Sequence, residues 1–475
     1  MNTEKVFTLT TRIRMNDEIY QYLTEYITEY NRLYRRMWRM LCSAKGADAQ
    51  EFKEFYKSEN ILRRTADTIK WSVIGRKRAL YEYKKYELSD IEERISRLKN
   101  DAESIKQLIN KLKPDVTANK ASAAKLALYR RKKHLLYLKS NKLNMMIQKR
   151  DNLIKEIESG ELKLSFGGKG CFKKQFRLSE NKFSDHNEWY KYYIGQRDKV
   201  IDYIGGAAYT CGNDICQMYY DEETDRFNIK LRKEKFLSSK SDKYLDIENI
   251  RFNYLSEYLK KYIIQHQCAP HDGTDKTLRP LTYRIKRKGA KWYLQVIIKI
   301  PPADIVTSSS EGVISIKLTP EAVQTAETDK YGNLISLRKY ALEHSGTGSK
   351  GDNEMKKIIS EITGHAQNKG KDISIENLDF AKKLINETNK KTRAVLAKFA
   401  YSRFTSAVES SCYRKGVTLI TVNPAYTAVV SKGKYARQRK LSNIQATAYV
   451  IARLGQGFTD KFDGKTTKVN KRKTA

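Results

Sequence analysis

The stretch EGVISIKLTPEAVQTAETDKYGNLISLRKY (311–340) decides the fold of the C-terminal part of this chain. It holds three short runs rich in apolar and β-branched residues, and the turn sequence DKYGN separates the second run from the third. Such runs, divided by turn residues, predict three consecutive antiparallel strands. DISIENL (372–378) and GVTLITV (416–422) predict two further strands, with helical patterns at 392–415 and 441–458. A meander followed by alternating strands and helices is compatible with a ribonuclease-H-like α/β core, although composition does not separate it from other α/β folds.

The N-terminal third is dominated by helical patterns. Residues 4–14 predict a strand, and Asn16 and Asp17 are placed to cap a helix whose apolar residues recur every three or four positions as far as Leu41. Two longer helical patterns fill residues 86–159, with the break KPDVT (113–117) between them. Because proline interrupts a helix, this break predicts an antiparallel helical hairpin.

From about residue 160 the pattern changes to short alternating segments with frequent glycines, which predicts a β-rich barrel or sandwich. TYRIKRK (282–288) and KWYLQVIIKI (291–300) predict a hairpin, which Pro301 and Pro302 end. The fold class predicted is therefore α+β and multidomain. We expect an N-terminal strand (1–15), a helical part (16–160), a β-rich part (161–310) and an α/β part with a basic tail (311–475).

The charge of the chain points to its partners. Its 475 residues include 92 Lys and Arg against 55 Asp and Glu, a formal net charge of +37. A folded chain this basic repels itself, so nucleic acid is the expected partner. Hydrophobic residues make up 40% of the chain, which is enough for folded cores. No apolar run is long enough for a membrane span or resembles a signal sequence, and the six cysteines form no CxxC pair. We expect no membrane partner and a reducing, cytoplasmic, nucleoid-associated location.

Several strings resemble one protein family. GVISIKL (312–318), ISIENL (373–378), NPAYT (423–427) and LSNIQATA (441–448) are similar, in this order, to the RuvC-like nuclease segments of the transposon-encoded TnpB proteins and of the compact type V-F CRISPR effectors. The resemblance implies a helical recognition lobe, a β-rich wedge domain and a RuvC (ribonuclease-H-like) domain. It also implies guide RNA and target double-stranded DNA as partners, with the sequence read by base pairing.

The resemblance also predicts what is left of the nuclease site. The family places its first catalytic carboxylate where this chain has Lys317, its second at Glu376, and its third at or beside Asn443. Two Mg²⁺ ions need several carboxylates, and an ammonium group at Lys317 would oppose a cation there. We therefore expect an inactive site with no metal or other cofactor, in which Lys317 pairs with Glu376. The alternative is an active Mg²⁺-dependent endonuclease with a rearranged site built from Glu327, Asp329 and Asp379.

Basic residues on several predicted elements are the candidates for binding nucleic acid. They are clustered near the end of the first strand, on the polar side of the first helix, in the second arm of the hairpin, in the β-rich part, and between NPAYT and the last helix. They are Arg12, Arg14, Arg32, Arg35, Arg36, Arg39, Arg130, Arg131, Lys173, Lys174, Arg284, Lys286, Arg287, Lys432, Lys434 and Arg437, and the aromatic residue Tyr435 joins them as a candidate for stacking on a base.

The function expected from the sequence is sequence-specific, guide-RNA-dependent binding of double-stranded DNA without cleavage. By occupying its target, such a protein would regulate transcription, either by blocking RNA polymerase or by recruiting a factor such as a sigma factor. A homodimer on one guide is a further expectation, because V-F relatives act as dimers. A generic basic RNA-binding protein would explain the charge but not the ordered RuvC-like strings.

Overall fold

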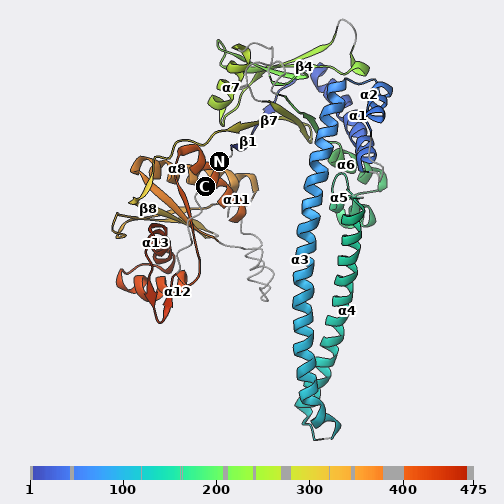
Figure 1. Ribbon diagram of the computed structural model, residues 1–475. Coiled ribbons are helices and arrows are strands. Elements are labelled where there is room, and N and C mark those ends of the chain that lie inside the picture. The colour runs from blue at the N-terminus through green and yellow to red at the C-terminus, as the bar shows by residue number, and fades with distance from the viewer. Residues whose placement is uncertain are drawn as a thin grey trace. The chain divides into compact units, whose positions relative to one another are not determined.

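The computed structural model describes residues 4–42, 48–118, 120–160, 162, 164–206, 212–238, 242–268, 280–319, 321–343, 348–377 and 401–467. The chain divides into two compact units (Figure 1). One unit is Val6–Lys299, and the other is Ile300–Ala475 together with Met1–Lys5. The helical and β-rich parts distinguished in the sequence thus fall within the same unit, and the fold class is α+β.

The helical part of the first unit begins with α1 (Asp17–Cys42), which the side chain of Asn16 caps by accepting a hydrogen bond from the Ile19 amide at 2.9 Å. Its buried face follows the predicted three- and four-residue spacing and includes Tyr26 and Tyr30. After α2 (Ala49–Ser58), the helices α3 (Arg63–Thr117) and α4 (Ala123–Ser159) form the antiparallel hairpin seen in Figure 1.

The hairpin differs from its prediction in two places. α3 begins at Arg63, well before residue 86, and it continues through Pro114 to end at Thr117. Pro114 is tolerated because it lies in the last turn of α3, where the carbonyl group that loses its partner can be hydrated. The two arms pack through Ile91, Ile95 and Leu153, and an ion pair of 2.8 Å between Lys149 and Glu87 links them at the surface.

The β-rich part contains two sheets. A four-stranded sheet has the order β1 (Lys5–Ile13), β7 (Lys291–Ile300), β6 (Thr282–Lys288), β2 (Val200–Tyr203). A three-stranded sheet has the order β3 (Cys216–Asp221), β4 (Arg226–Arg232), β5 (Tyr244–Ile250), and α7 (Ser256–Cys268) packs beside β3. The predicted β6–β7 hairpin is confirmed, with Lys288 paired to Lys291 across the turn.

One segment predicted as β is helical instead. CFKKQFRL (171–178) lies in α5 (Lys169–Lys173) and a 3₁₀ turn, η1 (Lys174–Phe176), which are followed by α6 (His186–Arg197). The indole of Trp189 fixes this arrangement, because its Nε1 donates to the Cys171 carbonyl at 3.2 Å and its ring stacks on Tyr193 at 5.2 Å. Aromatic packing therefore overrides the alternating pattern here.

The second unit is an α/β layer structure around a five-stranded sheet of order β10 (Leu334–Ala341), β9 (Ala322–Thr328), β8 (Ser308–Leu318), β11 (Lys371–Glu376), β12 (Leu419–Val422). β8, β9 and β10 form the predicted antiparallel meander, and β11 lies parallel to both β8 and β12. The strands predicted in this region are confirmed.

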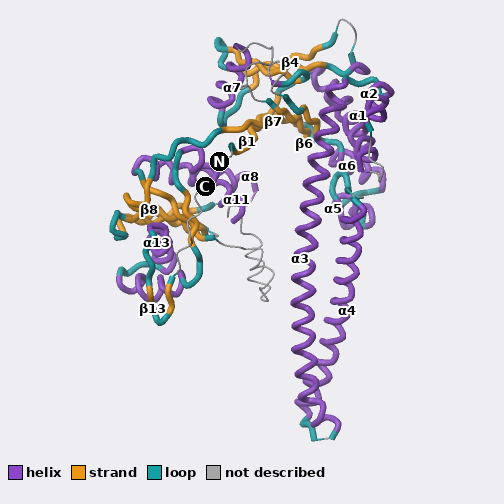
Figure 2. The backbone as a smooth tube through the Cα atoms, viewed as in Figure 1, coloured by secondary structure: helices purple, strands orange, loops and turns teal. Residues whose placement is uncertain are grey.

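Helices cover both faces of this sheet (Figure 2). α8 (Gly348–Lys369) and α11 (Tyr401–Lys415) pack on the face that bears Ile314, Ile316 and Ile375. α13 (Asn443–Gln456) packs on the other face, and Gly455 permits a close approach, since an added Cβ would lie 2.7 Å from the Cβ of Ser374. α12 (Thr427–Val430) and a π-helical turn, η5 (Ser431–Ala436), precede α13. A short hairpin, β13 (Lys461–Phe462) and β14 (Lys465–Thr466), follows it.

None of the described helices is long and apolar enough to span a bilayer.

Candidate functional site

The carboxyl ends of β8, β11 and β12 meet at one edge of the sheet because the three strands run parallel. Ile375 of β11 is in register with Ile316 of β8, and Glu376 is in register with Val422 of β12. This register places Lys317 and Glu376 on neighbouring strands. Both lie on the α13 face, since Ser315 and Ser374, two residues earlier on each strand, donate hydrogen bonds to carbonyl groups of α13.

Lys317 and Glu376 form an ion pair between Nζ and Oε2. Glu376 is 4% exposed, and its other carboxylate oxygen accepts a hydrogen bond of 2.9 Å from the hydroxyl of Thr427. Both oxygens of the buried carboxylate are therefore satisfied by protein groups. The pairing expected from the sequence is confirmed, and it brings a cation to the position where the resemblance places a catalytic carboxylate.

Asn443 is exposed at the start of α13, directly after the N-cap residue Ser442. The hydroxyl of Ser315 donates to the Ala448 carbonyl at 2.6 Å, whereas Gly455, later in α13, packs near Val313, earlier in β8. The N-terminal end of α13 therefore points toward the end of β8 that bears Lys317. Asn443 adds no charge to this edge. Across the described residues, no three His, Cys, Asp or Glu side chains are grouped to hold a metal ion. The described residues of this edge supply one carboxylate, which is already paired, and by themselves do not fit a two-metal site.

Glu327, a member of the alternative carboxylate set, lies on the other face of the sheet. It is in register with Ile314, which belongs to the core under α8. Its carboxylate accepts from Lys371 Nζ at 2.7 Å and contacts His365 Nε2 at 3.1 Å. Burial by itself would raise the pKa of Glu327. Hydrogen bonds from Lys371 and His365 outweigh burial and bring the pKa down to about 2.

Asp329, a second member of that set, lies in a turn and not beside Glu376. Asp329 accepts hydrogen bonds from the amides of Tyr331 and Asn333 in the β9–β10 turn, where it shapes the backbone. Asp379 lies outside the described residues.

Three of the four arginines of α1 are held by acidic residues of the same unit. Arg32 and Arg36 both pair with Glu59, and Arg35 pairs at 2.5 Å with the buried Asp198. These ion pairs join α1 to its neighbours, although Arg32 and Arg36 remain exposed. Arg39 is exposed and has no ion pair within the described chain.

The basic residues of the β-rich part also include some that contact other protein groups and some that are exposed. Arg284 donates to Asp202 at 2.6 Å, and the guanidinium of Arg287 lies 5.6 Å from the ring centre of Trp292. Lys286 is half-buried, and Lys174 lies over the ring of Tyr192 at 4.9 Å.

Exposed candidates without an ion pair in the described residues are Arg12, Arg14, Arg130, Arg131 and Lys173.

The segment before α13 requires a correction. Tyr435 is only 6% exposed, so it cannot stack on a base as the sequence analysis expected. Its ring packs edge-on against Tyr449 at 4.9 Å and its hydroxyl donates to Asp460 at 2.6 Å. Lys434 also pairs with Asp460, at 2.9 Å. Lys432 and Arg437 are exposed and remain candidates for binding a phosphate.

Sequence reasoning missed the residues that complete these arrangements. Thr427 belongs to the NPAYT string, yet its hydrogen bond to Glu376 depends on the turn into α12. Asp198, Asp202 and Asp460 each neutralise an arginine, and no sequence pattern common to the three marked them for this role.

No protein-family model matches the chain, and no curated protein matches it. Among solved structures, "Cryo-EM structure of CRISPR-Cas12f Ternary Complex" shares 13% identity, with a TM-score of 0.20 over 94% of this chain and 98% of that chain. "Cryo-EM structure of the Cas12f1-sgRNA-target DNA complex" shares 12% identity, with a TM-score of 0.21 over 94% and 99%. "Crystal structure of the Cas12i1-crRNA binary complex" shares 11% identity, with a TM-score of 0.18 over 79% and 44%. TM-scores this low do not establish a shared fold.

The Glu327 cluster predicts a pH-dependent contribution to stability. Because the folded pKa of Glu327 is about 2 against 4.5 for an ordinary glutamate, its stabilising effect is complete above pH 4.5 and is lost as the pH falls toward 2. Glu327→Gln should lower the free energy of unfolding by about 3 kcal/mol at pH 6, and the difference from wild type should shrink between pH 4.5 and pH 3. Urea unfolding across this range measures it. The exposed control Glu409→Gln should change little, and a difference independent of pH would contradict the assignment.

The Lys317–Glu376 pair predicts strong coupling in a double-mutant cycle. Lys317→Met leaves the buried carboxylate of Glu376 without its cation and should cost about 2 kcal/mol in unfolding free energy. Lys317→Met combined with Glu376→Gln removes both charges and should recover most of that loss. Lys339→Met, an exposed lysine of β10, is the matched control. Additive effects of the two single variants would show that the pair is not coupled.

Proposed function

We propose that this chain is a guide-RNA-dependent protein that binds double-stranded DNA sequence-specifically and does not cleave it. The observation that carries the proposal is the Lys317–Glu376 ion pair at the carboxyl ends of β8 and β11. It stands in a sheet whose antiparallel meander is extended by two parallel strands, which is the arrangement expected of a RuvC (ribonuclease-H-like) core. The ordered strings that resemble TnpB and type V-F effectors supply the RNA and DNA partners.

The chemistry of the edge supports binding without cleavage. Cleavage by a RuvC-type nuclease requires two divalent cations held by several carboxylates. Here the one carboxylate retained from the family's set is buried and neutralised by an ammonium group, and Asn443 contributes no charge. Glu327 faces away and is itself paired with Lys371. The alternative, an endonuclease with a rearranged site, has less support from these contacts.

The charge of the chain supports a nucleic-acid partner. A net charge of +37 remains although acidic residues neutralise several of the candidate arginines. Cations without an ion pair in the described residues lie on β1, on α4 and on η5, where they can contact phosphates of a duplex. Occupying a DNA site without cutting it would control transcription, by blocking RNA polymerase or by recruiting a transcription factor such as a sigma factor. A homodimer on one guide belongs to the same proposal.

The first test is whether binding is guided. Purified protein should carry a bound RNA, and its affinity for duplex DNA should require complementarity to that RNA. We expect a mismatched duplex to bind at least about 100-fold more weakly, and binding to weaken steeply with salt. Gel-shift titrations with DNA designed from the sequenced RNA measure both. Equal affinity for complementary and unrelated duplexes would favour a generic RNA-binding protein instead.

The second test is whether the ion pair replaces nuclease activity. A target plasmid incubated with the RNA-loaded protein and Mg²⁺ should stay intact. Lys317→Asp with Asn443→Asp restores carboxylates at two of the family's positions and should give Mg²⁺-dependent cleavage. Lys339→Asp with Asn333→Asp, on β10 and its preceding turn, adds the same charge elsewhere and should not. Robust cleavage by the unmodified protein would establish the endonuclease alternative.

A further inference from the structure

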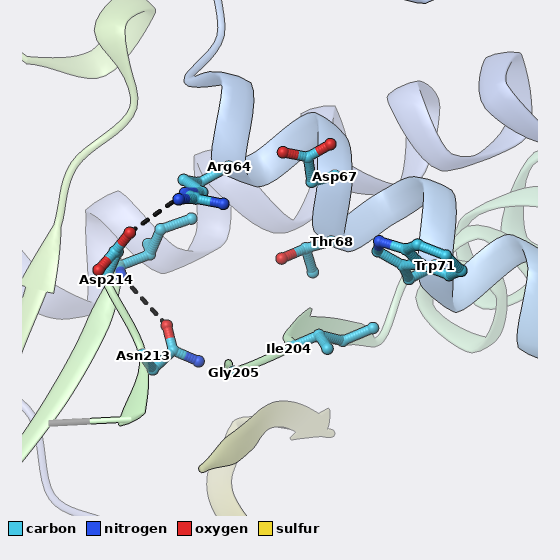
Figure 3. A pocket seen from close by; sticks show the side chains of 9 residues that line it. Arg64, Asp67, Thr68, Trp71, Ile204, Gly205, Asn213 and Asp214 are labelled. Carbon is cyan, nitrogen blue, oxygen red and sulfur yellow. Dashed lines mark hydrogen bonds and ion pairs between the residues drawn. The ribbon is translucent and has the colours of Figure 1, made fainter. Parts of the chain in front are cut away.

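A pocket of about 210 Å³ lies in the first unit, where the beginning of α3 faces the end of β2 (Figure 3). Four side chains spaced along one face of α3 form one wall, and the segments 204–205 and 213–215 form the other. The α3 residues are Arg64, Asp67, Thr68 and Trp71. None of the residues already discussed for DNA cleavage takes part.

The shape of the pocket suits one planar ring system. The indole of Trp71 is 59% exposed and offers a flat apolar surface, while Ile204 and Ile215 supply apolar contacts opposite. Gly205 lets that wall pack closely against the backbone behind it, because an added Cβ would collide with the carbonyl groups of Leu281 and Gly212. Sites for drug-sized ligands are generally about 300–1,000 Å³, so this pocket accepts a ring and leaves any attached sugar and phosphate outside.

Two polar groups in the pocket have no partner. Thr68 is 5% exposed, yet its hydroxyl makes no hydrogen bond among the described residues, and Figure 3 shows its oxygen directed toward the side of the pocket formed by Arg64 and Asp214. The half-buried Asp67 also has no hydrogen bond or ion pair there. Both groups are open to the pocket, so a ligand there would meet a carboxylate that accepts hydrogen bonds beside a hydroxyl that can donate or accept one.

The remaining polar groups are already occupied. Asp214 pairs with Arg64 at 3.1 Å. The amide of Asn213 donates to the carbonyl groups of Tyr203 and Leu281 and accepts from the Ile215 and Cys216 amides. The pocket therefore offers an acceptor at Asp67, a hydroxyl at Thr68 and an aromatic wall at Trp71.

We propose that this pocket binds an unpaired guanine base. Among the four bases, guanine alone presents two adjacent N–H donors, N1 and N2, which match the two oxygens of one carboxylate such as that of Asp67. Its ring would stack on Trp71, in the way that proteins read extrahelical bases. A phosphate is disfavoured by the two carboxylates. A cationic side chain is disfavoured because Arg64 already lies in the pocket of a chain with a charge of +37.

The inference rests on the proposed function only for the source of the guanine, which is an unpaired nucleotide of the bound RNA or of the DNA. Base pairing with a guide reads the target strand, whereas this pocket reads one base that is not paired. The two activities can therefore be separated by experiment.

The test measures the binding of labelled pentanucleotides, none complementary to the guide, by fluorescence anisotropy to the full-length chain freed of RNA. The set is UUGUU, UUAUU, UUCUU and inosine-containing UUIUU, with the deoxy forms of each. We expect guanine to bind about tenfold or more tightly than adenine, and inosine, which lacks the N2 amine, to fall between them. Repeating the titration with the RNA-loaded protein distinguishes the sources: loss of guanine binding assigns the pocket to the bound RNA, and its retention assigns it to DNA.

Variants locate the effect. Asp67→Asn should reduce the preference for guanine to less than about threefold, Trp71→Ala should weaken all pentanucleotides, and Trp71→Phe should restore part of that loss. Glu92→Gln, which changes an exposed and unpaired carboxylate on the same helix, should leave the preference unchanged. Equal affinity for all bases, a preference that survives Asp67→Asn, or displacement by arginine amide rather than by guanosine monophosphate would overturn the proposal. If complementary DNA binding persists in that case, the proposed function stands without the pocket.

Discussion

The ion pair between Lys317 and Glu376 depends on the parallel register of β8 and β11, and the interpretation of the C-terminal unit depends on that pair. A buried carboxylate without a cation is costly, so Glu376 needs a positive partner in any folded state that leaves it ionised. In a metal-dependent nuclease, divalent ions fill that role. Here a lysine of the same chain fills it, and the edge is electrically complete before any nucleic acid arrives. Under the proposed function, this pairing is what would let the chain bind a nucleic acid and leave it intact.

The same reasoning changes the meaning of the net charge. Many of the basic residues are not available to a polyanion, because buried acids such as Asp198, Asp202 and Asp460 hold them in internal pairs. Burial by itself would raise the pKa of Asp460, but hydrogen bonds from Arg453, Tyr435 and Lys434 outweigh it and lower the pKa below its ordinary value. The carboxylate therefore stays ionised and the pairs persist. The lysines and arginines therefore have two roles: some pair with buried acids inside each unit, and exposed ones without such a partner are available to phosphates.

The strand meander, the parallel strands, the β6–β7 hairpin and the long helical hairpin could be predicted, because each rests on a local pattern of apolar residues or on turn residues. The start of α3 was not predicted, because the buried face of its first turns consists largely of small and polar residues, Thr65, Ala66 and Thr68, rather than of large apolar ones. The helical form of 169–176 depends on Trp189, which is more than ten residues away in sequence. The Lys317–Glu376 pair was predictable only through alignment to family motifs. Burial of Tyr435 was not, because it depends on the long-range contacts to Tyr449 and Asp460.

Under the proposed function, the chain combines two different kinds of recognition. A cationic surface contacts the phosphates that every duplex shares, so it supplies affinity and leaves sequence to the guide. The pocket beside Trp71 has the opposite character: it is small, lined by carboxylates, and suited to one base edge rather than to a backbone. In a chain so basic, an open acidic group such as Asp67 would be expected to attract a neighbouring lysine or arginine, yet it has none in the described residues. An open carboxylate suits a ligand that donates hydrogen bonds to it. Among the parts of a nucleic acid, a base that has left the helix carries such donors and no charge.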